Sequence, residues 1–340
     1  MIDKTNDKTG IPTVAITIGD PAGIGPEITL KALCDEDLSG ICNVVIVGDR
    51  STLMSTAKQL GLVSDLIESR ISPVILDLKN VPASVAIGEE SAASGKASAE
   101  YIEKAVELWR EKKVDAIATA PISKNAISMA GYPFPGHTEF LASLTHTKDF
   151  AMSFFAGDLR VILLSTHVSL LSAIALVKKN ALVDLIAFSS SQLARLLRRP
   201  VKLAVAGLNP HASENGMFGD EEAREIAPAI NECRERFNID VSGPFSPDTI
   251  FLRGHRGEFD GVIACYHDQA TIAVKSLSFG NSVNVTLGLP LIRTSVDHGT
   301  AFDIAGKGIA EASSMAAAIK LAAELARGEA SLIMSNTDFS

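Results

Sequence analysis

The sequence predicts an α/β protein, and three observations lead to that fold class. Short apolar stretches alternate with stretches of helical periodicity along nearly the whole chain of 340 residues. Three apolar stretches, VILLSTH, LAVAGLNPH and GVIACYH, end in His167, His211 and His267. A glycine-rich polar loop, DHGTAFDIAGKG, lies near the end of the chain. Because open α/β sheets bind ligands at the carboxyl ends of their strands, these features predict a binding site there.

The individual elements follow from apolar runs and periodicity. Strands are expected at Thr13–Ile18, Val44–Val47, Val74–Leu78, Val114–Thr119, Val161–Leu164, Leu203–Ala206 and Phe259–Tyr266. Helices are expected at Ile28–Leu33, Ser51–Leu60, Ser91–Lys112, Phe140–Leu144, Lys178–Leu197, Glu221–Phe237 and Ser313–Arg327. Residues 1–10 are expected to form a frayed tail, and residues 64–90 an antiparallel excursion around the Val74–Leu78 strand.

Gly- and Pro-rich segments near residues 131 and 288 predict how the chain divides into lobes. Residues 1–131 and 288–340 are expected to form a first lobe from both ends of the chain. Residues 132–287 are expected to form a second lobe inserted between them, and this lobe carries the three strand-end histidines.

Composition excludes several classes of protein. A formal net charge of −9 argues against a nucleic-acid partner, because phosphate backbones are bound by basic surfaces. The polar N-terminal residues contain no apolar core of a signal peptide, and no apolar run approaches the length of a membrane span. The four cysteines form no CxxC pair, which is typical of reduced thiols in a cytoplasmic enzyme.

The three strand-end histidines predict a metal site. The chain contains only seven histidines, and neutral imidazoles from three strand ends can converge on one divalent cation. The alternative is that each histidine bonds a nearby backbone carbonyl. Asp268 and Asp248 are candidates for orienting these ligands or for accepting protons, and turn or capping carboxylates are the alternative for both.

Other polar residues predict an anionic substrate. Lys275, Asn284 and Arg293 combine two cations with an amide and flank the glycine-rich loop, although solvated surface cations are the alternative. His137-Thr138 opens a helix, with Thr138 as the expected N-cap, and amides at a helix N-terminus can meet a negative group.

At this point the chain resembles the 4-hydroxythreonine-4-phosphate dehydrogenase family over nearly its whole length. The motifs that carry the resemblance are TVAITIGDPAGIGPEI, GHTEF, THVSL, NPHASENGMFGDEE, YHDQ and RTSVDHGTAFDIAGKG. Two of them are also similar to GDGIGPE and HGSAPDIAGKGIA of the isocitrate and isopropylmalate dehydrogenases. That similarity implies a two-lobed α/β/α sandwich with its active site in the interlobe cleft. It also implies NAD bound without a G-x-G-x-x-G fingerprint, which this chain lacks.

The resemblance also implies which residues form the site. The family's metal ligands correspond to His167, His211 and His267, and they would hold one Zn, Mg, Co or Mn ion. Its substrate contacts correspond to His137, Thr138, Lys275, Asn284 and Arg293. The loop that holds the adenosine half of NAD in the relatives corresponds to His298, Gly299, Thr300, Asp303 and Ile304. Family members are homodimers whose metal takes ligands from both chains, so a homodimer is implied here.

The implied reaction is NAD-dependent oxidation of a 3-hydroxy acid followed by decarboxylation. The metal would lower the pKa of the substrate hydroxyl and stabilise the enolate left by carbon dioxide. Lys275 is the candidate for proton transfer or for pairing with the phosphate.

Two positions indicate which branch of the family is involved. Ala270 follows YHDQ where enzymes of vitamin B6 (pyridoxine) biosynthesis usually carry glycine, and Ser213 replaces the glycine of their NPHAG. These changes resemble the branch of carbohydrate metabolism that converts D-threonate or D-erythronate 4-phosphate to dihydroxyacetone phosphate. The alternative substrate is 4-hydroxy-L-threonine 4-phosphate. More remote alternatives are a metal-dependent hydrolase or lyase without NAD, and a non-catalytic binding protein.

Overall fold

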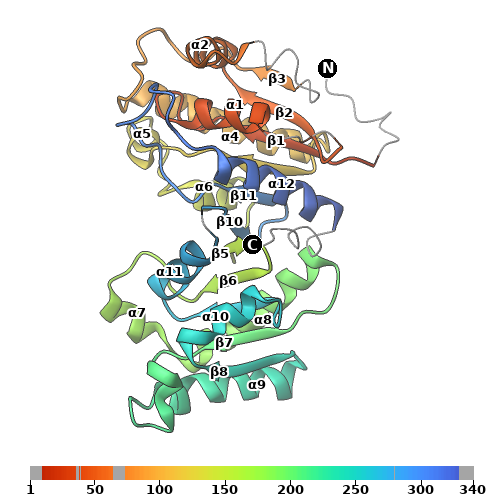
Figure 1. The fold of residues 1–340 in the computed structure, drawn as a ribbon, viewed down its shortest axis with the longest axis vertical. Coiled ribbons are helices and arrows are strands. Elements are labelled where there is room, and N and C mark those ends of the chain that lie inside the picture. Colours follow the sequence, from red (N-terminus) through yellow and green to blue (C-terminus); the bar gives the residue numbers. More distant parts are fainter. Residues whose placement is uncertain (1–9, 36–37, 39, 64–72, 279, 329–340) are drawn as a thin grey trace, which may run out of the picture. The chain divides into compact units, whose positions relative to one another are not determined.

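The computed structural model describes residues 10–35, 38, 40–63, 73–278 and 280–328 (Figure 1). The chain forms two compact units, and each unit is built from two separate stretches of the sequence. The first unit comprises Met1–Phe150 and Leu289–Arg327, and the second comprises Ala151–Gly288 and Gly328–Ser340.

The first unit contains a parallel sheet with strand order β3-β2-β1-β4-β11. Its strands are β1 (Thr13–Thr17), β2 (Asn43–Gly48), β3 (Val74–Asp77), β4 (Ala116–Thr119) and β11 (Ile292–Ser295). Every residue of β1 and β4 is buried, which is the expected pattern for parallel strands covered by helices on both faces. The sheet brings β11, late in the chain, beside β4.

The helices of the first unit are α1 (Gly25–Asp35), α2 (Arg50–Leu60), α4 (Ala92–Arg110), α5 (Lys124–Met129), α6 (His137–Leu144) and α12 (Ser313–Arg327). Local sequence explains where several of them begin and end. Asp49 caps α2 by accepting a 2.8 Å hydrogen bond from Thr52 N–H, and Gly61 ends that helix in the left-handed conformation. Ser91 caps α4 in the same way through Ser94 N–H.

The second unit contains a mixed sheet with strand order β10-β5-β6-β9-β7-β8. Its strands are β5 (Ala151–Ala156), β6 (Leu159–Leu163), β7 (Leu203–Ala206), β8 (Val241–Phe245), β9 (Gly261–Ala264) and β10 (Val283–Leu287). β5 is antiparallel to β6 and β10, whereas β6, β9, β7 and β8 run parallel. The carboxyl ends of these four parallel strands therefore meet at one edge of the sheet.

The helices of the second unit are α7 (Leu170–Leu176), α8 (Lys179–Leu197), α9 (Ala227–Phe237), α10 (Pro247–His255) and α11 (His267–Ser278). Two irregular turns accompany them, a 3₁₀ turn at Pro210–Glu214 and a π turn at Glu222–Ile226 that leads into α9. Figure 1 shows β7, β8 and α9 together in green to cyan.

The α/β fold class is confirmed, and so is the alternation of strands with helices. The expected antiparallel excursion is wrong at β3, because Val74–Asp77 pairs parallel with β2. The strand expected to reach Tyr266 ends at Ala264, and a helix begins at His267. Residues 1–9 and 64–72, which include most of the expected tail and part of the excursion, lie outside the described residues.

The two units differ from the expected lobes in where residues 132–150 belong. These residues lie in the first unit rather than in an inserted second lobe. The reason is apolar packing, since Phe140 and Leu141 are buried in the core of the first unit. Phe134 stacks on Phe140 with ring centroids 4.6 Å apart, and Tyr132 packs on it at 5.4 Å.

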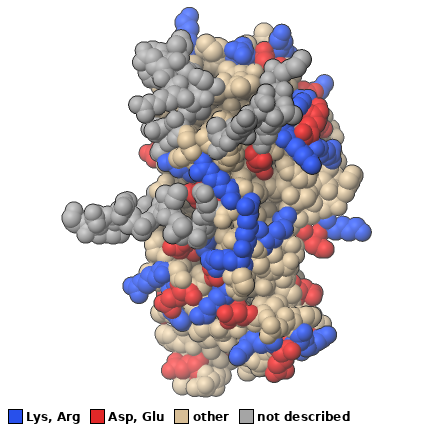
Figure 2. Space-filling view, turned by 90° about the vertical axis from the view of Figure 1, so that its right-hand side faces the viewer, with Lys and Arg blue, Asp and Glu red and all other residues tan. Residues whose placement is uncertain are grey.

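Two further properties concern the surface and the helices. Figure 2 shows acidic side chains beside basic ones on the face in view. Among the helices of the described residues, none is both long and apolar enough to cross a membrane.

Candidate active site

The first unit contains a buried arginine, Arg293. Arg293 on β11 is only 3% exposed and donates to the Thr119 hydroxyl from Nε at 3.2 Å and from Nη2 at 2.9 Å. Burial lowers the pKa of the guanidinium to about 9, although the nearby Glu139 carboxylate opposes that shift. Burying a cation costs free energy that an anionic ligand can offset.

His137 lies at the start of α6, close enough to Arg293 for their charges to interact. Burial, and secondarily the Arg293 charge, lower the pKa of His137 well below its usual range, so the imidazole is neutral at pH 7. Its Nε2 is inaccessible to solvent and has no hydrogen-bond partner in the described structure. A buried imidazole nitrogen without a partner indicates that a ligand completes its bonding.

The N-terminus of α6 adds backbone donors to this group. Gly136 occupies the N-cap position, and no side chain of the described residues caps the helix. The expectation that Thr138 is the N-cap is therefore wrong, because Thr138 is the second residue of α6 and is itself buried. Arg293, His137 and this helix end together form a site suited to an anion.

Two of the three predicted histidines lie together in the second unit. His167 follows β6 and His267 follows β9, and these strands are paired in parallel. Their ring centroids are 5.7 Å apart. Imidazoles that bind one cation through nitrogens at about 2.1 Å have centroids within roughly 6.5 Å of each other, so this pair fits a shared metal ion. Asp268 Oδ1 lies 2.7 Å from His267 Nδ1, which leaves Nε2 for such an ion.

The structure does not bring His211 into the same group. The described residues contain no cluster of three or more His, Cys, Asp or Glu side chains able to hold a metal. His211 follows β7 on a turn in which residues 211–215 have φ values of 52°, 51°, 67°, 44° and 57°. The left-handed conformation costs about 1–2 kcal/mol per non-glycine residue, so this turn is strained. The ring of His211 lies 6.3 Å from the ring of Phe218.

The remaining predicted residues of the second unit lie in different surroundings. Lys275 is exposed on α11, and none of the described residues forms an ion pair with it. Asn284 lies on β10, and its Oδ1 is buried with no hydrogen-bond partner in the described structure. Asp248 is exposed and accepts a hydrogen bond from the Ser246 hydroxyl at the start of α10, and no side chain of the described residues caps that helix.

The predicted nucleotide loop belongs to the first unit and is anchored on the segment that follows β1. Ile24 N–H donates to Thr300 O at 3.0 Å. A Cβ at Gly23 would lie 2.9 Å from the same oxygen, so the close approach requires glycine. His298, Gly299 and Asp303 are exposed, whereas Thr300 and Ile304 are partly buried. Exposed backbone groups and a carboxylate fit the hydroxyls of a ribose.

The sequence did not reveal the residues that hold the predicted nucleotide loop in place. Buried Glu27 accepts a 2.9 Å hydrogen bond from Ala310 N–H at the far end of the nucleotide loop. Lys31 bonds Glu27 and donates to the carbonyls of Gly308 and Ala310 at 2.9 and 2.8 Å. The i, i+4 spacing of Glu27 and Lys31 is a visible sequence signal, but it is equally typical of an exposed helical pair.

Comparison with known proteins identifies the chain as an oxidoreductase. The chain is 42% identical to a crystal structure of 4-hydroxythreonine-4-phosphate dehydrogenase from Klebsiella pneumoniae, covering 93% of this chain and 99% of that one with a TM-score of 0.83. It is 44% identical to D-threonate 4-phosphate dehydrogenase of Salmonella typhimurium, over 92% of this chain and 99% of the relative. It is 42% identical to 4-hydroxythreonine-4-phosphate dehydrogenase of Desulforapulum autotrophicum, over 92% and 95% respectively.

The family follows from these matches. The chain belongs to the PdxA family, described as pyridoxal phosphate biosynthetic protein PdxA, whose sequence model matches residues 40–322. The resemblance stated from the motifs alone is thereby confirmed, and so is the dehydrogenase class.

Proposed function

We propose that the chain catalyses the NAD- and metal-dependent oxidation and decarboxylation of a 4-phosphorylated 3-hydroxy acid. D-Threonate 4-phosphate or D-erythronate 4-phosphate would yield dihydroxyacetone phosphate and carbon dioxide. The observation that carries the proposal is the anion site of the first unit, made of buried Arg293, the unpartnered Nε2 of His137 and the uncapped start of α6. A charged group with two or more anionic oxygens, such as a phosphate, can engage all three.

The neutral state of His137 supports the same reading. An imidazole that is uncharged at pH 7 can donate one hydrogen bond to a phosphate oxygen without adding a second buried cation beside Arg293. Thr138 would add a donor from the first turn of α6. We propose Asn284 and Lys275 as further substrate-binding residues, with the unpartnered Oδ1 of Asn284 accepting from a substrate hydroxyl.

His167 and His267 are the residues proposed to hold the divalent metal. We propose His211 of a second copy of the chain as the third ligand, because the family resemblance implies a metal that takes ligands from both chains. When bound, the metal would supply positive charge near the substrate oxygens, and NAD would supply the hydride acceptor that the oxidation needs. Asp268 fixes the orientation of His267 through its 2.7 Å contact with Nδ1. Lys275 is the proposed proton donor to C2 after carbon dioxide has left, since its exposed ammonium has no ion-pair partner among the described residues. For NAD, the proposed residues are His298, Gly299, Thr300, Asp303 and Ile304.

We propose that the enzyme acts as a homodimer. The supporting feature is the apolar surface of α7 and the residue before its cap. Val168 is 48% exposed, and Leu170, Leu171 and Ile174 are 59%, 80% and 38% exposed. An exposed leucine-rich face of this kind indicates an interaction surface. A second copy of the chain is the partner that the family resemblance implies.

The alternative substrate is 4-hydroxy-L-threonine 4-phosphate, which has an amine rather than a hydroxyl at C2. The two positions that distinguish the branches, Ala270 and Ser213, are both buried. We propose that they affect substrate choice through the conformation of the backbone around them. Ala270 lies in α11 between His267 and Lys275. Alanine stabilises a helix by about 0.5–1 kcal/mol relative to glycine, so α11 is more rigid here than it would be with glycine. Ser213 Oγ accepts a 3.2 Å hydrogen bond from Gly216 N–H within the turn that carries His211.

The test is NADH formation followed by absorbance. Purified enzyme is given NAD with D-threonate 4-phosphate, D-erythronate 4-phosphate or 4-hydroxy-L-threonine 4-phosphate, each with a divalent metal and with a chelator. Faster metal-dependent turnover of the sugar acids supports the proposal. Faster turnover of the amino acid would instead support the alternative, an enzyme of vitamin B6 biosynthesis. Absence of NADH from all three substrates with metal present would refute the dehydrogenase assignment and leave a hydrolase or lyase without NAD.

A further inference from the structure

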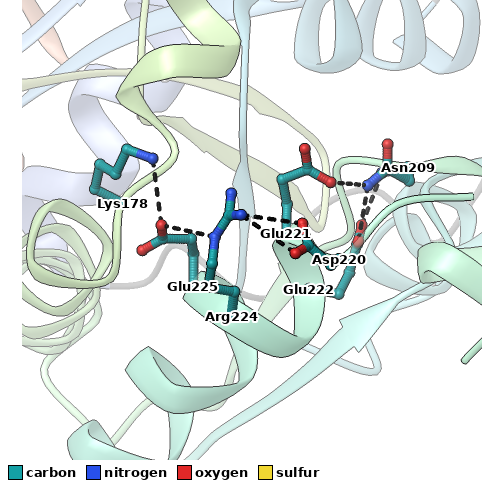
Figure 3. Close-up of polar contacts among 7 residues, drawn as sticks. All are labelled: Lys178, Asn209, Asp220, Glu221, Glu222, Arg224 and Glu225. Carbon is teal, nitrogen blue, oxygen red and sulfur yellow. Dashed lines mark hydrogen bonds and ion pairs between the residues drawn. The ribbon is translucent and has the colours of Figure 1, made fainter. Parts of the chain in front are cut away.

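A buried carboxylate, Glu222, binds the segment that leads into the strained turn at His211. Glu222 Oε1 accepts hydrogen bonds from Leu208 N–H at 2.8 Å and Asn209 N–H at 2.7 Å. Its Oε2 accepts from the Asn209 side-chain amide at 2.9 Å (Figure 3). Glu222 is 3% exposed, and none of the Lys and Arg residues described in the structure forms an ion pair with it. Three N–H donors therefore satisfy this carboxylate in place of a cation.

The position of Glu222 depends on the π turn before α9. Glu222 is the first residue of that turn, and Glu221 beside it also accepts from the Asn209 amide, at 2.8 Å (Figure 3). A π turn places one more residue in the helical turn than an α-helix does and often occurs at functional sites. Both acidic side chains therefore bind the short segment that ends at His211.

A second contact ties the same segment to the strand end that precedes His267. Gln269 donates from Nε2 to Gly207 O at 2.8 Å and accepts from Cys265 N–H at 2.7 Å. A Cβ at Gly207 would lie 2.9 Å from Ala212 Cα and 3.2 Å from Glu222 Oε1, so only glycine permits this packing. Both Glu222 and Gln269 therefore hold the segment between β7 and His211.

We propose that Glu222 is a positioning residue for His211, which it holds through Leu208 and Asn209 on the left-handed turn. The proposal rests on the proposed function, in which His211 is a metal ligand. Left-handed non-glycine backbone persists only where its surroundings impose it, and such strain gathers at functional sites. The three bonds of Glu222 end two residues before His211, so they control where the turn begins.

The test measures metal affinity directly, without turnover. Metal-free wild-type protein, Glu222→Ala, Glu222→Gln and His211→Ala are titrated with Co²⁺ and followed by calorimetry and by the visible absorption of bound cobalt. The matched control is Glu225→Gln, because Glu225 lies in the same turn but bonds Lys178 instead of the His211 segment (Figure 3). Glu225 also accepts from the backbone N–H of Lys179. Circular dichroism and melting temperature establish that each variant is folded.

Glu222→Ala is expected to weaken Co²⁺ binding about 10- to 100-fold and to alter the cobalt spectrum, which loss of stability alone would not do. Glu222→Gln keeps one oxygen for the two backbone donors, so its loss is expected to be several-fold smaller. Glu225→Gln is expected to bind Co²⁺ like the wild type. Wild-type affinity and spectrum in both folded Glu222 variants would overturn the proposal while leaving the metal assignment intact. If His211→Ala also binds like the wild type, the metal assignment itself fails, and the role of Glu222 fails with it.

Discussion

Replacing Arg293 by methionine separates binding of the substrate anion from stability of the fold. Burial lowers the pKa of Arg293 from 12.5 to about 9, which corresponds to roughly 5 kcal/mol of disfavoured charge in the absence of ligand. Methionine fills a similar volume without that cost, so Arg293→Met is expected to melt at or above the wild-type temperature. A bound phosphate loses its buried charge partner, which costs about 2–5 kcal/mol. The value of kcat/KM should therefore fall about 30- to several thousand-fold.

The assay compares D-threonate 4-phosphate with unphosphorylated D-threonate. The loss should appear mainly with the phosphorylated substrate, because the missing contact is to its phosphate. Arg50→Met is the control, since Arg50 is an exposed arginine of the same unit. An equal loss with both substrates, or a loss below about three-fold, would refute the assignment of Arg293 to the phosphate.

The same residue predicts a pH dependence. The protonated guanidinium binds the anion, and kcat/KM reports the ionisation of the free enzyme. With a pKa of about 9 in the free enzyme, kcat/KM for the phosphorylated substrate should fall as the pH rises through about 9. Arg293→Met should lack that alkaline limb, whereas Arg50→Met should retain it.

Three further changes test other parts of the structure. Burial raises the pKa of Asp20 from 3.8 to about 6, so the folded state binds this proton more tightly than the unfolded state does. The resulting contribution to the free energy of unfolding is fully present below pH 3.8 and is lost as the pH rises through 6. At pH 7.5, Asp20→Asn should therefore be more stable than the wild type by up to about 3 kcal/mol, and this advantage should vanish near pH 4 in denaturant unfolding. Leu171→Glu places a charge on the exposed face of α7 and should shift the protein from dimer to monomer in analytical ultracentrifugation. Lys31→Met removes the bonds to Gly308 and Ala310 and should weaken NAD binding about 3- to 30-fold by calorimetry, with a lower melting temperature because Glu27 loses its cation.

Each of these results has a contrary outcome. A pH-independent difference for Asp20→Asn would show that the carboxyl is not the group responsible. A dimer that survives Leu171→Glu would show that α7 is not the interface. Unchanged NAD affinity in folded Lys31→Met would show that the end of the loop at residues 308–310 does not position the nucleotide.

Sequence patterns predicted the strands best where burial is complete. β1, β4, β7 and β9 are buried at every residue, and each lies within or close to its expected range. Strand order could not be predicted, because β11 reaches β4 across more than 170 residues and no local pattern encodes that pairing. The helix at His267 was missed because the apolar run continues through Tyr266, although the strand ends at Ala264.

The candidate site shows the same limit. Reasoning from strand ends correctly placed His167 beside His267, because the two strands are parallel neighbours. His211 lies on left-handed backbone, which none of the residue types in NPHASEN predicts. Its separation from His167 and His267 could therefore not be predicted from the sequence. Glu222 and Gln269 act through backbone groups close in space but distant in sequence. Arg293 was predicted as a substrate contact, but its burial was not predicted, since burial comes from the assembled sheet.

The central claim is that the enzyme both oxidises and decarboxylates a phosphorylated hydroxy acid. The most direct measurement is the stoichiometry of NADH and carbon dioxide formed from D-threonate 4-phosphate labelled with ¹³C at C1, with NAD and divalent metal. One NADH and one labelled carbon dioxide for each substrate consumed is the predicted result. NADH without labelled carbon dioxide would contradict decarboxylation, and consumption of substrate without NADH would contradict the oxidation.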